Sequence, residues 1–292
     1  LYTPTSGRIV YGGETIFQGD DPWPVGEDGE KHHAKVAKGK QVNMLPYRRK
    51  MQIIFQDPSA SLDPRMTVGE IIGEALDIHK LCASKQERTD RIKELLGMVG
   101  LNTEHANRYP HEFSGGQRQR IGIARALAVN PRFIICDEPV SALDVSIQAQ
   151  IINTFEDLQK KLGMAIIMIT HDLGIVSSMC EKIAVMYAGH IVEYGTTDEI
   201  FYNPQHEYTK GLINSIPKLN AEEKERLVPI EGQPVDLLNP PAGCPFAPRC
   251  SQCMKVCLRE MPPYTDISDE HYSACWLIQK EAYQNAAGGE SK

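Results

Sequence analysis

Short apolar runs alternate with stretches of helical periodicity along much of the chain. Four apolar runs are short enough to be buried strands, at residues 51–55, 132–136, 164–169 and 183–187. Apolar residues recur at helical spacing in four other stretches, at residues 85–99, 114–128, 145–162 and 173–179. Because strands that alternate with helices form parallel sheets with both faces covered, the last three runs predict an α/β fold built on a parallel sheet.

Near the start of the chain the pattern is different. Residues 8–17 alternate between apolar and polar and turn at Gly12-Gly13, which predicts a β-hairpin. Residues 18–43 are polar and rich in turn formers, so they predict a surface loop. His32 and His33 lie in this loop without a carboxylate or thiol at metal-ligand spacing, and we expect them to be solvated.

Two capping boxes mark helix starts in the middle of the chain. Thr67 stands three residues before Glu70, and Ser114 stands three residues before Gln117. In such a box the two side chains satisfy backbone amides that the first helical turn leaves unpaired. Residues 58–128 are therefore predicted to form a helical subdomain.

Polar side chains follow two strands of the predicted sheet. Asp137 and Glu138 come directly after the run 132–136, and His171 follows the run 164–169. Ligands of such sheets bind beyond the carboxyl ends of the strands. Adjacent carboxylates there cost desolvation energy unless a cation compensates, and Mg²⁺ is the natural one. The alternative is that both acids only stabilise the start of a helix.

Two glycines open the helix predicted at residues 114–128. Its first residues are Ser114-Gly115-Gly116-Gln117-Arg118. Glycine lets the backbone approach an anion closely, and amide dipoles together with Arg118 supply positive potential. An ordinary helix cap that contains glycine is the alternative.

Charge and hydropathy narrow the function classes. The 292 residues carry 31 Lys and Arg against 38 Asp and Glu, a net charge of -7, so we expect no nucleic-acid partner. The longest apolar runs are far below the roughly 18 residues of a membrane helix, and the first residues do not resemble a signal peptide. These features predict a soluble, cytoplasmic chain.

Five of the eight cysteines crowd the last fifth of the chain. They are Cys244, Cys250, Cys253, Cys257 and Cys275. This many soft ligands in a loop-rich segment suit an iron-sulfur cluster or zinc. Reduced thiols packed in a small domain are the alternative.

Taken in order, these motifs resemble those of an ATP-binding subunit of an ABC transporter, over nearly the whole chain. The motifs are Gln56, the run from Phe113 to Leu127, the pair Asp137-Glu138, Asp144 and His171. The resemblance implies a P-loop NTPase-like ABC ATPase domain with a mixed, largely parallel sheet, a helical subdomain and a small Cys-rich C-terminal extension. We expect the ATPase domain to span residues 1–203, the extension 204–280 and a flexible tail 281–292.

The resemblance also implies a role for each motif. Gln56 would contact Mg²⁺ and nucleotide, Asp137 would hold Mg²⁺, and Glu138 would be the general base. His171 would contact the γ-phosphate, and Asp144 would lie between two subunits. The family signature would close over ATP held by a second subunit, with Ser114, Gly115, Gly116 and Gln117.

The C-terminal segment resembles that of oligopeptide and dipeptide importer ATPases. Gly232-Gln233-Pro234 and the cysteines carry this resemblance. It implies a [4Fe-4S] cluster as a cofactor and leaves Cys253 as a spare thiol. The implied ligands are Cys244, Cys250, Cys257 and Cys275. Nickel importers share parts of the pattern, so a nickel-importer ATPase is an alternative.

One family motif does not occur: the chain contains no Gly-x-x-x-x-Gly-Lys-Ser/Thr. The family places this P-loop just before the segment that resembles residues 1–7. Without it, the lysine and amide cradle for the phosphates is missing. Since the first residue is Leu1 rather than Met, we expect the natural chain to begin further upstream and the chain as given to be inactive.

The resemblance thus predicts an ATP hydrolase that energises the import of oligopeptides or dipeptides across the cytoplasmic membrane. Its implied partners are a second, different ABC ATP-binding subunit, transmembrane permease subunits bound near Gln56 and the helical subdomain, and indirectly an extracytoplasmic peptide-binding protein. We expect a peripheral location on the cytoplasmic face. The alternatives are a soluble ABC ATPase of repair or translation and a non-catalytic or regulatory protein that lacks the P-loop.

Overall fold

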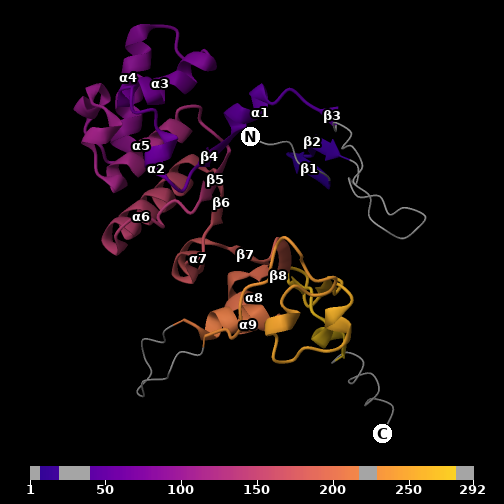
Figure 1. Ribbon diagram of the computed structural model, residues 1–292. Helices are drawn as coiled ribbons and strands as arrows, with labels where there is room; N and C mark the ends of the chain where they lie inside the picture. Colours follow the sequence, from indigo (N-terminus) through magenta and orange to yellow (C-terminus); the bar gives the residue numbers. More distant parts are fainter. Residues whose placement is uncertain (1–6, 20–39, 217–228, 281–292) are drawn as a thin grey trace. The chain divides into compact units, whose positions relative to one another are not determined.

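A computed structural model describes residues 7–19, 40–216 and 229–280 (Figure 1). The chain divides into two compact units, residues 1–169 and 170–292. Both predicted loop histidines, His32 and His33, and the predicted tail at 281–292 lie outside the described residues. Within the described residues, no helix is long and apolar enough to cross a membrane.

The first unit contains two separate sheets and several helices (Figure 1). Its strands are β1 (Gly7–Tyr11), β2 (Glu14–Gly19), β3 (Lys40–Gln41), β4 (Met51–Ile54), β5 (Phe133–Asp137) and β6 (Ala165–Ile169). Its helices are α1 (Leu45–Lys50), α2 (Pro58–Ser61), α3 (Val68–Ile78), α4 (Lys85–Met98), α5 (Gly115–Leu127) and α6 (Val145–Leu162). Two 3-10 turns lie at Thr103–Asn107 and Pro110–Glu112.

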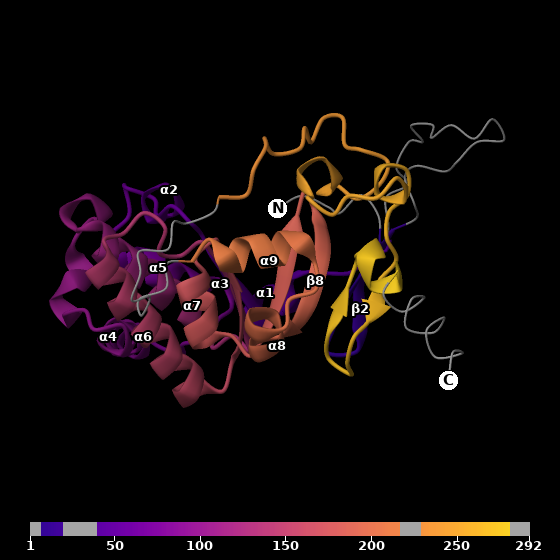
Figure 2. The ribbon, with the colours of Figure 1, turned by 90° about the horizontal axis from the view of Figure 1, so that it is seen from below.

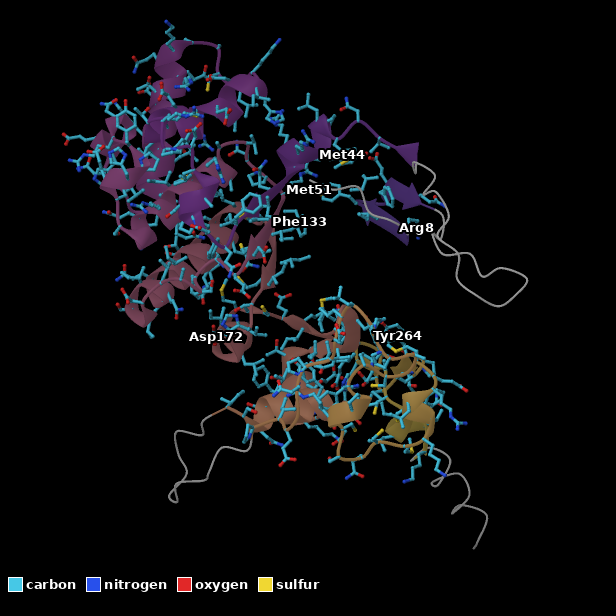
Figure 3. The ribbon with its side chains drawn as sticks, viewed as in Figure 1. Arg8, Met44, Met51, Phe133, Asp172 and Tyr264 are labelled. Atoms are coloured by element: carbon cyan, nitrogen blue, oxygen red, sulfur yellow. The ribbon has the colours of Figure 1, made fainter. Side chains whose placement is uncertain are left out.

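A parallel sheet is present with the strand order β4-β5-β6. Two of the three runs predicted for it form β5 and β6, and the third strand, β4, comes from the run at 51–55. Met51 of β4 pairs with Phe133 of β5, both labelled in Figure 3. Phe133 in turn pairs with Ala165 of β6. Alternate side chains of β5 are fully buried, among them Ile134 and Cys136. Because the three strands run in parallel, the segments that follow them all begin at the same edge of the sheet.

Both predicted capping boxes are confirmed. Thr67 accepts a hydrogen bond from the backbone N–H of Glu70 at the start of α3, and Ser114 accepts one from Gln117 at the start of α5. Residues 58–127, all of them described, carry α2 to α5 and no strand. The extent of a helical subdomain and the other domain boundaries stay predictions.

The second unit contains an antiparallel sheet in the order β7-β8-β10-β9. Its strands are β7 (Lys182–Tyr187), β8 (His190–Thr196), β9 (Thr265–Asp266) and β10 (Tyr272–Ser273). Its helices are α7 (Leu173–Met179), α8 (Thr197–Tyr202) and α9 (Glu207–Asn214), with 3-10 turns at Ala247–Arg249 and Val256–Leu258 (Figure 2).

The prediction that residues 183–187 belong to the parallel sheet was wrong. They lie in β7, which pairs antiparallel with β8. The two turn residues, Ala188 and Gly189, have φ values of 50° and 82°. A two-residue turn with two positive φ angles matches the twist of the flanking strands and so favours an antiparallel hairpin. The local turn therefore decides the partner of β7.

The Cys-rich segment belongs to the core of the second unit. Phe246 and Cys257 are buried in the same apolar cluster as Val192 of β8 and Ile200 of α8. The domain boundary expected at 203/204 falls inside this unit, between α8 and α9.

Candidate functional site

Two of the predicted site residues meet at the carboxyl edge of the parallel sheet. Gln56 follows β4, and its Nε2 donates a hydrogen bond of 2.8 Å to Oε2 of Glu138, which follows β5. Asp137 is the last residue of β5 and is half-buried. The sheet therefore brings a carboxylate pair and an amide together where polar chemistry was expected.

The backbone of Glu138 is held in an unusual conformation. Its φ of 42° lies in the left-handed region, which costs a non-glycine residue roughly 1–3 kcal/mol. Two contacts maintain it: the N–H of Glu138 donates to the carbonyl of Ile169 at 2.9 Å, and its carbonyl accepts from Ser141 Oγ at 3.2 Å. Ser141 also lies 3.5 Å from Gln56 Nε2, so it is a further member of this site.

The signature residues form the N-terminus of α5. Ser114 and Gln117 complete the capping box, with Ser114 N donating to Gln117 Oε1 at 3.1 Å. A Cβ added to Gly115 would lie 3.3 Å from Leu143, and one added to Gly116 would lie 2.5 Å from Ile147. The glycines therefore allow α5 to approach the segment around Asp144 closely.

Glycine at position 116 makes a testable contribution to packing. Gly116→Ala forces Ile147 to move and is expected to lower the free energy of unfolding by about 1–3 kcal/mol. Gly122→Ala is a matched control in the same helix, because nothing lies within 4 Å of its added Cβ, and it should gain up to about 1 kcal/mol. Denaturant unfolding measures both; equal effects would contradict this account.

Arg118 has partners other than the anion predicted for it. Its Nε donates to the carbonyl of Pro110 at 2.8 Å, and its Nη1 donates to Ser59 Oγ at 3.0 Å. A longer contact of 3.4 Å joins Nη2 to the carbonyl of His111. The Arg118 guanidinium therefore forms its hydrogen bonds to residues 59, 110 and 111 and does not supply positive charge beside Gly115 and Gly116.

Asp144 and His171 follow their predicted elements. Asp144 precedes α6 and is exposed, and its side chain makes no capping hydrogen bond, so helix capping does not account for the acid. His171 belongs to the second unit. The next residue, Asp172, accepts from the amides of Gly174 and Ile175 and starts α7 (Figure 3).

The four predicted cluster cysteines line one small cavity in the second unit. They share its lining with apolar residues and with three polar ones, His206, Glu207 and Gln252; the cysteines are Cys244, Cys250, Cys257 and Cys275. All four are free thiols, and burial raises the pKa of Cys250 and of Cys275 to about 11. Cys253 does not line the cavity and is exposed.

Two further residues organise this region, and the sequence analysis missed both. Burial lowers the pKa of His206 to about 4, its Nδ1 accepts from the N–H of Tyr208 at 3.1 Å, and its Nε2 lies 3.9 Å from Cys244 Sγ. Glu193 is fully buried and contacts the N–H of His206 at 2.9 Å and Nε2 of His271 at 2.8 Å. Their roles could not be predicted from the sequence, because the residues that Glu193 contacts lie 13 and 78 positions away from it.

Gly243 allows the two cysteine loops to meet. The N–H of Cys244 donates to the carbonyl of Cys257 at 2.8 Å. A Cβ on Gly243 would overlap that carbonyl oxygen and lie 2.9 Å from the backbone nitrogen of Arg259. Because backbone atoms cannot move aside as a side chain can, Gly243 is required for this approach.

We expect Gly243→Ala to open the cysteine loops and to destabilise the second unit by about 2–4 kcal/mol, a range set by overpacking and a broken backbone hydrogen bond. Gly97→Ala in α4 is the control, since its added Cβ meets nothing within 4 Å. Alkylation of the two buried thiols, Cys244 and Cys257, in native protein reports the opening. Unchanged protection in Gly243→Ala would refute the steric argument.

Comparison with known proteins identifies the family of the chain. Two family profiles match: "ABC transporter" over residues 1–141, and "Oligopeptide/dipeptide transporter, C-terminal region" over residues 192–257. The oligopeptide transport ATP-binding protein OppD of Bacillus subtilis (strain 168) is 47% identical over 272 residues, 92% of this chain and 72% of that protein. OppF of the same organism is 54% identical over 217 residues, 74% of this chain and 65% of that protein.

Among solved structures, the chain is similar to cbiO1 from Clostridium perfringens, part of the ABC transporter complex cbiONQ. The TM-score is 0.54 at 26% identity, over 70% of this chain and 71% of that one. The fold and the motif order therefore define an ABC-type ATPase. With the C-terminal match and the identity to OppD, the chain belongs to the family of oligopeptide and dipeptide transport ATP-binding proteins.

Proposed function

We propose that this protein is the ATP-hydrolysing subunit of an importer of oligopeptides or dipeptides. The observation that carries the proposal is the joint match of the ATPase core and of the C-terminal region at residues 192–257, which includes most of β8 and four of the five clustered cysteines. Relatives at 42–54% identity carry peptide transport or peptide import in their names. A nickel-importer ATPase is the second candidate.

In this proposal Glu138 is the general base for the water that attacks ATP. Its carboxylate is oriented by the hydrogen bond from Gln56 and by the strained backbone between Asp137 and Ser141. A fixed base supports phosphoryl transfer because positioning and charge neutralisation supply most of the rate. His171 is proposed to donate a hydrogen bond to the γ-phosphate.

Asp137 and Gln56 fit a magnesium ion. Gln56 uses its Nε2 toward Glu138, which leaves its amide oxygen as the ligand atom, and the carboxylate of Asp137 supplies a second oxygen. Mg²⁺ is usually bound by one or two carboxylates together with substrate phosphates. Among the described residues, no group of three His, Cys, Asp or Glu side chains is arranged to hold a metal ion. A magnesium ion bound partly by phosphates does not require such a group. When bound, the ion neutralises charge on the phosphates.

The remaining roles involve a second subunit. Ser114, Gly115, Gly116 and Gln117 are proposed to close over ATP held by another ABC ATP-binding subunit, a different chain, with Asp144 at the junction. Amides at the N-terminus of α5 suit an anion.

We place the permease on the surface near Gln56 and residues 58–128, with the protein peripheral on the cytoplasmic face. An extracytoplasmic peptide-binding protein is the indirect partner. Residues 1–203 would form the ATPase domain and 204–280 the extension.

The cysteine cavity is proposed to hold a [4Fe-4S] cluster. Each of its irons takes one thiolate, so the ligands surround a volume instead of converging on one ion, and four cysteines on the wall of a mainly apolar cavity fit that requirement. Iron and labile sulfide in anaerobically purified protein, lost together in Cys275→Ser and retained in Cys253→Ser, would support the cluster. Zinc alone, or no metal at all, would refute it.

Transport is tested with the full-length subunit assembled with its permease, partner ATPase and binding protein in liposomes. Peptide-stimulated ATP hydrolysis with accumulation of labelled peptide is the expected result. Nickel accumulation without peptide accumulation would favour the second candidate. Stimulation by neither solute would overturn the proposal.

A further inference from the structure

Two arginines of α5 hold the short helix α2. Arg118 donates from Nη1 to Ser59 Oγ at 3.0 Å, and Arg125 donates from Nη1 to the carbonyl of Ser61 at 2.5 Å. The two arginines are seven residues apart, which is about two helical turns, so they lie on the same side of α5. Arg118 binds near the beginning of α2, and Arg125 binds at its end.

Helix α2 is in turn joined directly to Gln56. Asp57 separates them, and its Oδ1 accepts from the amides of Ser59 and Ala60 at 2.7 and 3.2 Å. A four-residue helix is not stable by itself, because it has too few internal hydrogen bonds to offset nucleation. The position of α2 is therefore set by Asp57 on one side and by α5 on the other.

We infer that Arg118 and Arg125 are positioning residues that make Gln56, α2 and the N-terminus of α5 move as one body. The contacts run from Glu138 to Gln56, through the Asp57 cap to Ser59, and on to Arg118, three residues from Gly115. A displacement of Gln56 by nucleotide then shifts the signature glycines as well. This inference rests on the proposed function only for its effect on turnover; the mechanical link itself does not depend on which solute is carried.

Ser59 provides the sharpest test, because it is exposed and its hydroxyl can be removed without disturbing the core. In the assembled importer, Ser59→Ala should lower kcat about 3- to 10-fold while KM for ATP stays within about twofold, as expected for a lost hydrogen bond to a charged group that acts on positioning. Ser59→Thr, which keeps the hydroxyl, should restore turnover. Ser178→Ala is the control, since that exposed hydroxyl only donates to a carbonyl of its own helix.

A second readout requires no turnover. Hydrogen exchange of the amides at residues 59–61 should quicken in Ser59→Ala and in Arg118→Lys. Adding Ser59→Ala to Arg118→Lys should change it little further, because the contact between Arg118 and Ser59 is already lost. Exchange in α4 should not change. Additive effects, or wild-type exchange and turnover in Ser59→Ala, would overturn the inference. If exchange responds but wild-type protein shows no solute-stimulated turnover, the proposed function fails and the link stands.

Discussion

Glu138→Gln is expected to lower ATP turnover of the assembled importer by about 10²- to 10⁴-fold, the range that a general base contributes. Glutamine has the same shape and can still accept the hydrogen bond from Gln56, now 2.8 Å from the carboxylate. The local structure should therefore persist, and ATP binding should remain. Single-turnover hydrolysis and equilibrium binding of labelled ATP separate the two effects.

The control for this prediction is Glu94→Gln in α4, an exposed acid paired with Arg91. It removes the same charge far along the sequence from the sheet edge and should leave turnover unchanged. Residual activity of Glu138→Gln near the wild-type level would exclude Glu138 as the base. Loss of ATP binding together with turnover would instead assign Glu138 a role in holding the nucleotide.

Glu193→Ala is expected to destabilise the second unit by about 3–5 kcal/mol, the cost of removing one partner of a buried pair. Three groups point at this carboxylate: the N–H groups of Gln205 and His206, at 2.6 and 2.9 Å, and Nε2 of His271, at 2.8 Å. Alanine leaves the buried groups of His206 and His271 and the half-buried N–H of Gln205 without this acceptor. Denaturant unfolding followed by the fluorescence of Trp276 measures the loss.

Glu270→Ala is the matched control, because Glu270 pairs with Lys182 at the surface of the same unit. Such exposed pairs contribute little to stability. A loss in Glu193→Ala no larger than in Glu270→Ala would show that the three contacts do not stabilise the fold.

Local signals in the sequence were sufficient for much of the first unit. The capping boxes at Thr67 and Ser114 placed the starts of α3 and α5 correctly, since a cap involves residues only three positions apart. The site residues Gln56 and Glu138 follow neighbouring parallel strands, so their proximity could also be anticipated. The roles of these residues remain predictions.

Distant pairings could not be read from local patterns. Strand β7 looked like a member of the parallel sheet because nothing in its own residues indicates the partner, which the Ala188-Gly189 turn selects. Glu193 gives no sign of its role in the sequence, because its partner His271 comes 78 positions later. Likewise, Arg118 acquires its partners only when α2 and α5 come together.

The pairing of β10 with β8 also has a consequence for how the protein is made. During synthesis β8 emerges well before Tyr272, which pairs with Tyr194, so the nascent hairpin presents an unpaired edge while the intervening residues are translated. Contacts this distant in sequence form slowly and leave the intermediate open to aggregation. The last fifth of the chain therefore covers the exposed edge of β8 only at the end of synthesis. A truncated product that lacks β10 would keep this edge unpaired and would be prone to aggregation.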